Sequence, residues 1–142
     1  MEACGDDWEK NGDFCYLWKT DRKNWTDAED FCQKAGGHLA SEVDSNFTKD
    51  YILEGMRTRG LDKAWLGGND IEEEGVWKWT DCTPWEHSFW APGDPNNWFG
   101  GENCLEVYRR KWNDARCSDE KGFVCSKKIC SGRIYINISK AT

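Results

Sequence analysis

The early part of the chain contains two stretches in which apolar residues recur every three or four positions, as on one face of a helix. The first carries the capping-box pattern Thr26-x-x-Glu29 and runs to Gly36–Gly37, which favours its end there. The second can be capped by Asp44 or Ser45. The side chains expected to face the core are Ala28, Phe31, Cys32 and Ala35 in the first helix, and Phe47, Tyr51, Ile52 and Met56 in the second. The pattern thus predicts two helices, the second ending before Gly60.

Short strands are predicted over most of the remaining chain, because aromatic and β-branched runs alternate there with turn residues. The expected strands cover residues 14–18, 65–68, 76–79, 105–108, 110–112 and 122–126. Residues 83–103 have no sustained period and contain all three prolines. Such long loops are usually functional or disordered, and Trp85, Trp90 and Trp98 argue against disorder. We therefore expect an ordered functional loop.

The length of 142 residues favours one domain. We place it at residues 1–130, with residues 131–142 as a loose tail or an extra strand. The formal net charge of −7 argues against nucleic acid and anionic membranes as partners. No apolar run is long enough to cross a bilayer, so membrane insertion is not expected. The first residues lack the features of a secretion signal and predict a mature chain that carries a start methionine.

The eight cysteines are dispersed, form no C-x₂-C pair and are accompanied by only two histidines. This pattern disfavours a structural zinc site and is typical of disulfides formed in an oxidising compartment. The sequons at Asn24, Asn46 and Asn137 are acceptors for N-glycosylation in a secreted protein. Together these features predict an extracellular glycoprotein.

The segment from Asp94 to Asp114 is rich in carboxylates and carboxamides that stand beside proline and glycine. Crowded carboxylates repel one another unless a cation lies among them. Calcium takes six to eight oxygen ligands and accepts irregular geometry, so this segment predicts calcium binding. The sequence contains no nucleophile elbow, His-Glu-x-x-His helix or glycine-rich phosphate loop, and it does not predict an enzyme.

These features, in this order, resemble the C-type lectin-like domain over residues 4–130. Residues 65–68 stand at the family's Trp-Ile-Gly-Leu motif, although Gly68 replaces its last apolar residue. Residues 77–81 resemble a second family motif, after which Cys82 replaces a glycine. The resemblance implies an α+β fold with two helices, short antiparallel sheets and a long calcium-binding loop, stapled by disulfides.

The resemblance also implies how the cysteines pair, as Cys4–Cys15, Cys32–Cys125 and Cys104–Cys117. Cys82 and Cys130 stand outside this framework: they can bridge each other, each can bridge another chain, or Cys130 can link subunits while Cys82 stays free. The resembled fold places these two far apart, which favours at least one intermolecular bond. A disulfide-linked homo-oligomer is therefore expected, and linked sugar sites would gain from effective concentration.

In sugar-binding members of the family, five residues hold one calcium ion. The matching residues are Asp94, Asn96, Glu102, Asn113 and Asp114, and the resemblance implies a cis peptide between Asp94 and Pro95. The implied sugar-binding set is Asp94, Asn96, Trp98, Glu102 and Asn113. An auxiliary calcium site is matched by Asp70, Glu74, Asn97 and Asn103, with Glu102 shared, although its acidic part also fits a solvated surface turn. Two neighbouring sugar hydroxyls would each donate to a carboxylate and accept from an asparagine amide.

The order Asp94-Pro95-Asn96 resembles that of members that bind mannose, fucose or N-acetylglucosamine. Trp98 stands where galactose binders place a stacking indole, so a galactose-type lectin is one alternative, although packing of the loop is the favoured role of this side chain. A calcium-independent protein-binding or ice-binding member of the same fold is another. In that case the loop aromatics Trp85, Phe89, Trp90, Trp98 and Phe99 would contact the partner. The favoured prediction is a secreted lectin for glycans on cell surfaces or microbes, as in innate immunity.

Overall fold

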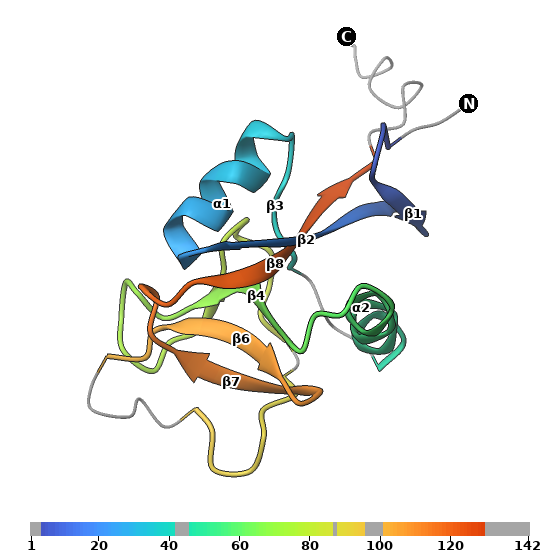
Figure 1. Ribbon diagram of the computed structural model, residues 1–142. Coiled ribbons are helices and arrows are strands. Elements are labelled where there is room, and N and C mark those ends of the chain that lie inside the picture. The colour runs from blue at the N-terminus through green and yellow to red at the C-terminus, as the bar shows by residue number, and fades with distance from the viewer. Residues whose placement is uncertain (1–3, 42–45, 87, 96–100, 130–142) are drawn as a thin grey trace, which may run out of the picture.

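The computed structural model of the chain describes residues 4–41, 46–86, 88–95 and 101–129. In chain order its elements are β1 (Glu9–Asn11), β2 (Phe14–Lys23), α1 (Trp25–Lys34), β3 (His38–Leu39), α2 (Asn46–Thr58), β4 (Lys63–Asn69), β5 (Lys78–Trp79), β6 (Cys104–Tyr108), β7 (Lys111–Ala115) and β8 (Lys121–Lys128). Figure 1 shows α1 and α2 on different sides of a twisted sheet. Neither helix of the described residues is long and apolar enough to cross a membrane.

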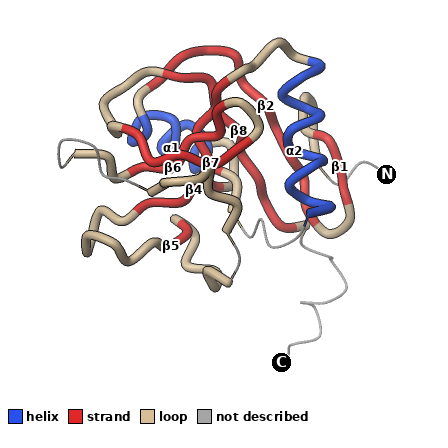
Figure 2. Tube along the Cα trace, turned by 90° about the horizontal axis from the view of Figure 1, so that it is seen from below, coloured by secondary structure: helices blue, strands red, loops and turns tan. Residues whose placement is uncertain are grey.

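One sheet holds the fold together, with its strands in the order β1-β2-β8-β4-β6-β7 and with β3 and β5 paired to β8 and β4. Neighbours are antiparallel except β4 and β8, which run parallel where Trp65 pairs with Phe123. The sheet is therefore mixed, whereas the sequence predicts only antiparallel pairs. Figure 2 shows β6 and β7 beside β4, with the loop that carries β5 beyond them. β7 ends the order and so has one edge that no strand of this order covers.

The two ends of the described chain lie together. Residues Phe14 to Lys19 of β2 pair with residues Lys128 back to Phe123 of β8, and Cys15 faces Lys127. Just beyond, the N–H of Ile129 donates to the carbonyl of Asp13 at 2.8 Å. Figure 1 shows β1 and this end of β8 on the side of the molecule away from the β6–β7 hairpin.

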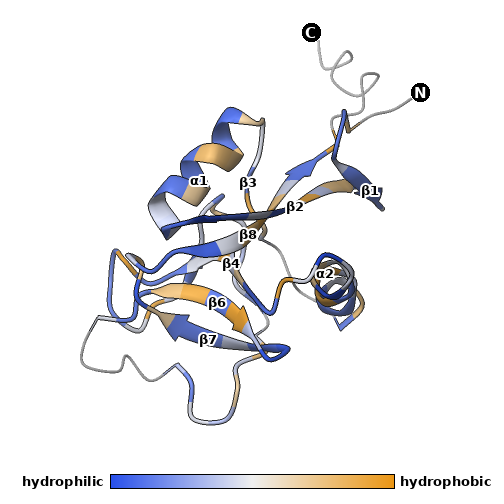
Figure 3. Ribbon diagram, viewed as in Figure 1, coloured by the Kyte–Doolittle hydropathy of each residue, from blue (hydrophilic) through white to orange (hydrophobic). Residues whose placement is uncertain are grey.

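Successive residues of a strand point to opposite faces of the sheet, and this alternation divides the core into two halves. On β2, Leu17 packs with residues of α1 and Trp18 packs with residues of α2. On β4, Trp65 packs on the same side as Leu17, and Leu66 packs on the same side as Trp18. All four side chains are buried. Each helix therefore covers one face of the sheet. Figure 3 shows apolar residues along β6, inside the sheet, and mostly hydrophilic residues along β7 at its edge.

α1 is capped two positions earlier than the capping-box pattern predicts. The N-cap is Asn24, whose Oδ1 accepts a 2.8 Å hydrogen bond from the N–H of Asp27. Glu29 is buried and does not serve Thr26, because its carboxylate joins α1 to β3 instead. Its partners are Gln33 Nε2 at 2.7 Å, His38 Nδ1 at 2.6 Å and the N–H of Leu39 at 2.9 Å. Three hydrogen bonds at a buried position stabilise the Glu29 carboxylate more than a single exposed bond to the backbone of Thr26 would.

In α2, the prediction that Phe47 faces the core is wrong, because this side chain is 72% exposed. The buried face consists of Ile52, Leu53, Gly55 and Met56. At 3.6 residues per turn, Phe47 points roughly opposite to the centre of that face. Tyr51 is half-buried at its border. The expected caps, Asp44 and Ser45, lie outside the described residues.

Most predicted strands are present, with longer or shorter bounds. The expected strand at 76–79 is reduced to the two residues of β5, and β7 extends to Ala115 rather than ending at Trp112. β1 is an addition to the predicted strands, because the sequence predicts a polar turn between the first two cysteines. β3 is an addition as well. The predicted tail, residues 131–142, lies outside the described residues.

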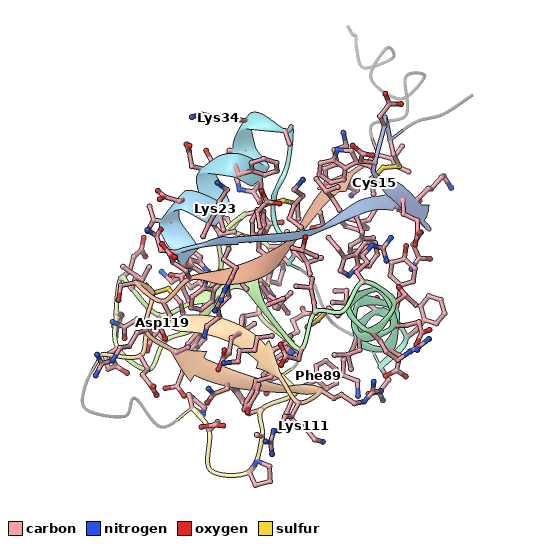
Figure 4. The ribbon with its side chains drawn as sticks, in the orientation of Figure 1. Cys15, Lys23, Lys34, Phe89, Lys111 and Asp119 are labelled. Carbon is pink, nitrogen blue, oxygen red and sulfur yellow. A yellow bond between two sulfur atoms is a disulfide. The ribbon has the colours of Figure 1, made fainter. Side chains whose placement is uncertain are left out.

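All three disulfides implied by the resemblance are formed, namely Cys4–Cys15, Cys32–Cys125 and Cys104–Cys117. Figure 4 shows their sulfur–sulfur bonds in yellow, with Cys15 labelled. Cys32–Cys125 joins α1 to β8 across a sequence separation of 93 residues. Cys82 is a free, exposed thiol, and Cys130 lies outside the described residues.

Candidate functional site

The long loop is hydrogen-bonded along the open edge of β7. The N–H of Trp112 donates to the carbonyl of Phe89 at 3.1 Å, and the N–H of Ala91 donates to the carbonyl of Trp112 at 2.9 Å. Trp90 and Trp112 thus form a parallel bridge. These bonds satisfy the N–H and the carbonyl of Trp112 at the edge and attach the loop beside Asn113 and Asp114.

A cluster of aromatic rings supports the same attachment. The ring of Trp112 lies at the centre of this cluster, and the residue is 2% exposed. The rings of Trp79, Trp85, Phe89 and Trp90 have centroids 5.2–5.8 Å from the ring of Trp112. A side chain at Gly68 would place its Cβ 2.9 Å from the Trp85 ring, which explains why glycine replaces the apolar residue of the resembled motif. The rings at 85, 89 and 90 therefore pack on the core, and Figure 4 shows Phe89 near the tip of the β6–β7 hairpin.

Asp94 lies one turn beyond this attachment. Its N–H donates to the carbonyl of Ala91 at 3.0 Å, and the peptide bond from Asp94 to Pro95 is cis, as the resemblance implies. Burial raises the pKa of the Asp94 carboxyl, and the negative charges of Asp114 and Glu106 raise it further. Asp94 is therefore close enough to both acids to be repelled by them, although it comes from a different segment.

Asn113 and Asp114 are adjacent on β7, the edge strand to which the loop that carries Asp94 is hydrogen-bonded. Asp114 is fully buried, at 0% exposure. Asn113 is half-buried and stands opposite Glu106 on β6, to whose Oε2 its Nδ2 donates at 2.6 Å. One short strand thus presents two of the expected calcium ligands at the edge that the loop covers.

Glu106 and Lys121 form a buried ion pair behind Asn113 that the sequence did not single out. Their exposures are 5% and 8%, and Lys121 Nζ lies 3.0 Å from Glu106 Oε1. The register of the hairpin could have revealed this pair. A two-residue turn at Arg109–Arg110, both with positive φ, sets Glu106 opposite Asn113.

The acidic turn before β5 brings three of the expected auxiliary ligands together. Asp70 is 2% exposed and accepts from the N–H of Gly75 at 2.8 Å. When the Asn103 amide is oriented to satisfy its surroundings, its nitrogen donates to Asp70 Oδ1 and Glu74 Oε1, both at 3.0 Å. Loss of hydration and a hydrogen bond to Asp70 raise the pKa of Glu74, and the charges of Asp70 and Asp114 add to this. This group therefore borders Asp114.

The remaining expected ligands are described in part. Glu102 is half-buried, while Asn96, Asn97 and Trp98 lie outside the described residues. Within the described ranges, no three histidine, cysteine or acidic side chains are grouped so that they could hold a metal by themselves. The expected sets depend on asparagine oxygens as well as carboxylates, and Asn96 and Asn97 belong to those sets.

A hollow of about 760 Å³ lies apart from these residues, between the loop before β4 and the turn before β8. Arg22, Asp62 and Lys121 are among the residues that line it, so its charges are mixed. None of the expected calcium ligands that the structure describes lines this hollow. Lys121, which lines this hollow, also pairs with Glu106 behind Asn113.

A family model described as the lectin C-type domain matches residues 21–127 of the chain. A C-type lectin mannose-binding isoform from Oxyuranus scutellatus is 36% identical over 132 residues, which are 87% of this chain and 82% of that protein.

Solved structures are similar as well. The C-type carbohydrate-recognition domain of cow CD23, crystallised in the presence of GlcNAc2Man3 oligosaccharide, has a TM-score of 0.83 and 31% identity, covering 92% of this chain and 100% of that one. Herring type II antifreeze protein has a TM-score of 0.82 and 26% identity, covering 89% and 100%. The same architecture is therefore present in a sugar-recognition domain and in an antifreeze protein.

Proposed function

The chain belongs to the C-type lectin domain family, and on that premise we propose that it is a calcium-dependent lectin for mannose-type sugars. The proposal covers a binding protein and not an enzyme. It places the protein outside the cell, with glycans on cell surfaces or microbes as its partners. The similarity to a mannose-binding relative and to a carbohydrate-recognition domain supports this choice over other uses of the fold.

The observation that carries the proposal is the attachment of the loop that carries Asp94 to the edge strand that carries Asn113 and Asp114. Asp94 comes from the long loop, Glu74 from the turn before β5 and Asp114 from the edge strand, yet the charge of Asp114 raises the pKa of both others. Burial is the main cause of both shifts and the neighbouring negative charges add to it, so the ionised forms are disfavoured, and a divalent cation would relieve this. Carboxylate and amide oxygens are the donors that calcium prefers, so the residues present fit this ion.

The proposed ligands of the principal ion are Asp94, Asn96, Glu102, Asn113 and Asp114. When bound, calcium would supply a centre to which two neighbouring sugar hydroxyls can coordinate. The chain's own residues would orient those hydroxyls, because carboxylates accept hydrogen bonds and asparagine amides donate them. Asp94 and Asn96 would hold one hydroxyl, and Glu102 and Asn113 the other. Asn96 lies outside the described residues.

The specificity we propose follows from the sequence order of Asp94 and Asn96. An acceptor before a donor is the order in mannose-type members, and it favours mannose, fucose and N-acetylglucosamine over galactose. Asp94 is one methylene shorter than the usual glutamate, which withdraws its carboxylate by about 1.5 Å. A galactose-type site with Trp98 stacked on the sugar remains the alternative to be compared directly.

At the auxiliary site we expect weaker calcium binding than at the principal site. The Asn103 amide nitrogen donates to Asp70 and Glu74 and so partly satisfies these acids without a metal. An asparagine in place of the usual aspartate also removes one negative charge, which weakens calcium binding. We expect titration at sub-millimolar calcium to reach about one ion per chain.

Retention on immobilised sugar tests the proposed function. We expect the protein to bind mannan-agarose in 1–5 mM calcium and to elute when a chelator is added, with weaker retention on galactose-agarose. Asp94→Asn should lose retention, whereas Asp21→Asn, a change at an exposed aspartate on β2, should keep it. Retention that persists in the chelator would contradict the proposal and favour a calcium-independent member of the fold, as the antifreeze neighbour illustrates.

We expect acid to weaken the stabilisation by calcium more than it affects the metal-free protein. Since folding raises the pKa of Asp94, the contribution of this group to the stability of the metal-free protein rises as pH falls through the range between its folded and unfolded pKa. Protons compete with calcium for the same carboxylates, so the stabilisation by calcium shrinks. That stabilisation is about 2.7 kcal/mol at a calcium concentration of 100 Kd.

Thermal melts from pH 7.5 to pH 5, recorded on dialysed metal-free protein and in calcium, provide the measurement. The two series of melting temperatures should converge towards pH 5. A calcium-dependent increment that is the same at both ends of the range would contradict binding by these carboxylates.

A further inference from the structure

Glu106 is a buried carboxylate on β6 that stands immediately behind the candidate site without being one of its expected ligands. It is 5% exposed between the buried side chains Leu105 and Val107. Its two oxygens have different partners. Oε2 accepts from Asn113 Nδ2 at 2.6 Å, and Oε1 lies 3.0 Å from Lys121 Nζ.

Lys121 fixes the orientation of Glu106. Its ammonium is buried among Glu106, Asp119 at 3.8 Å and the face of the Trp65 ring at 5.2 Å. Oε1 forms no hydrogen bond of good angle with any described group, so the ammonium contact alone compensates that oxygen. A buried ion pair is costly to desolvate and is often no more stable than apolar residues of equal volume. Stability alone is therefore a weak reason for this pair.

The contact with Asn113 matters because the two ends of a carboxamide are chemically different. The oxygen accepts and can ligate a cation, whereas the nitrogen carries two donors and repels one. Since Glu106 accepts from the nitrogen, the oxygen of Asn113 is left for another partner, and the second N–H is left as a donor. This is the orientation that a calcium ligand and sugar contact at Asn113 requires.

We propose that Glu106 is a positioning residue that, held by Lys121, fixes the amide orientation of Asn113 and so presents its oxygen to calcium. This inference rests on the proposed function for the identity of the ion, but not for the orientation itself. Residues that orient metal ligands typically contribute 10- to 100-fold to metal affinity.

Glu106→Gln tests the amide orientation of Asn113 without changing the shape of the side chain at position 106, because one carboxylate oxygen becomes an amide nitrogen. Lys121 still requires an acceptor, so the glutamine turns its oxygen to Lys121 and its nitrogen to Asn113. Asn113 must then turn its own oxygen towards position 106 and its nitrogen towards the ion. We expect calcium affinity to fall about 10- to 100-fold in this variant.

The double variant Glu106→Gln, Lys121→Met removes that constraint. Without the ammonium, the glutamine oxygen is free to accept from Asn113, so the calcium affinity should recover at least about fivefold relative to the single variant. Glu29→Gln is the matched control. Glu29, like Glu106, is a buried carboxylate with polar partners, but it lies at the α1–β3 connection. This substitution should destabilise the fold and leave calcium affinity unchanged below the melting temperature of the variant.

Calcium affinities from titration calorimetry, with metal-free melts as a folding check, provide the first measurement. Side-chain amide NMR signals of Asn113 in metal-free protein provide the second, since an N–H bound to a carboxylate shifts downfield in the wild type and returns in Glu106→Gln. Equal calcium affinity in wild type and Glu106→Gln, or no recovery in a folded double variant, would overturn the inference. An Asn113 signal that is unchanged by Glu106→Gln would overturn it as well. If the wild type binds no calcium, the proposed function fails, and the NMR comparison still decides whether Glu106 orients Asn113.

Discussion

Replacing Trp112 with alanine should lower the free energy of unfolding by about 3–5 kcal/mol and abolish calcium-dependent retention on mannan. Trp112 is almost fully buried, and four aromatic rings surround it. Removing its indole leaves a cavity between the sheet and the long loop. It also removes the support of the backbone bonds to Phe89 and Ala91 that hold the loop beside Asn113 and Asp114.

Trp18→Ala is the control for this experiment. Trp18 is also buried, at 6% exposure, but it packs against α2 and donates from Nε1 to the carbonyl of Ile52 at 3.2 Å. Its loss should destabilise the protein by a similar amount and leave calcium affinity unchanged at a temperature where the variant is folded. Denaturant unfolding and calorimetric titration measure the two effects. A Trp112→Ala protein that is folded and keeps wild-type calcium affinity would show that the cluster does not position the site.

Removing the Cys32–Cys125 bond by two alanine substitutions should cost about 4–5 kcal/mol of stability under oxidising conditions. This bond closes a loop with a separation of 93 residues, and its loss therefore restores a large entropy to the unfolded chain. It also joins α1 to the central strand β8, which contacts β2, β3 and β4. The measurement is the midpoint of urea unfolding, with the slope as a check on two-state behaviour.

The Cys4–Cys15 bond offers a matched comparison, since all four sulfurs belong to buried cysteines. Its separation is 11 residues, for which the chain-entropy argument gives about 3 kcal/mol. The variant without Cys32–Cys125 should therefore unfold at lower urea than the variant without Cys4–Cys15. The reverse order would mean that native-state strain or residual structure in the unfolded chain dominates over loop length.

Local patterns were sufficient for most elements of the fold. Alternation and turn residues located β2, β4, β6 and β8, because each of these strands has one face that packs on the core. The same reasoning missed β3, since its two residues have no period of their own and depend on pairing with β8. It also misplaced Phe47, because a helical face is decided by the tertiary surface it meets, and Leu53 rather than Phe47 lies on that surface.

At the candidate site, residue types were easier to predict than their partners. The resemblance named Asp94, Asn113 and Asp114 from their spacing, and the structure places Asp94 near Asp114. It gave no reason to consider Glu106 or Lys121, because ion pairing between β6 and β8 depends on strand order and register. Trp85 and Trp90, which the sequence offers as part of a partner surface, are partly buried and pack their rings against Trp112, while Trp98 lies outside the described residues.

The β1–β2 hairpin lies against the end of β8, and this has a practical consequence. Figure 1 shows them on the side away from the β6–β7 hairpin, which carries Asn113 and Asp114. A reporter protein, a biotin handle or a flexible spacer joined ahead of β1 or behind β8 would leave the described fold on the side away from the hairpin that carries the proposed site. Biosensor chips prepared by such terminal coupling should therefore display most molecules in a binding-competent orientation, whereas random coupling through surface lysines such as Lys111 should not.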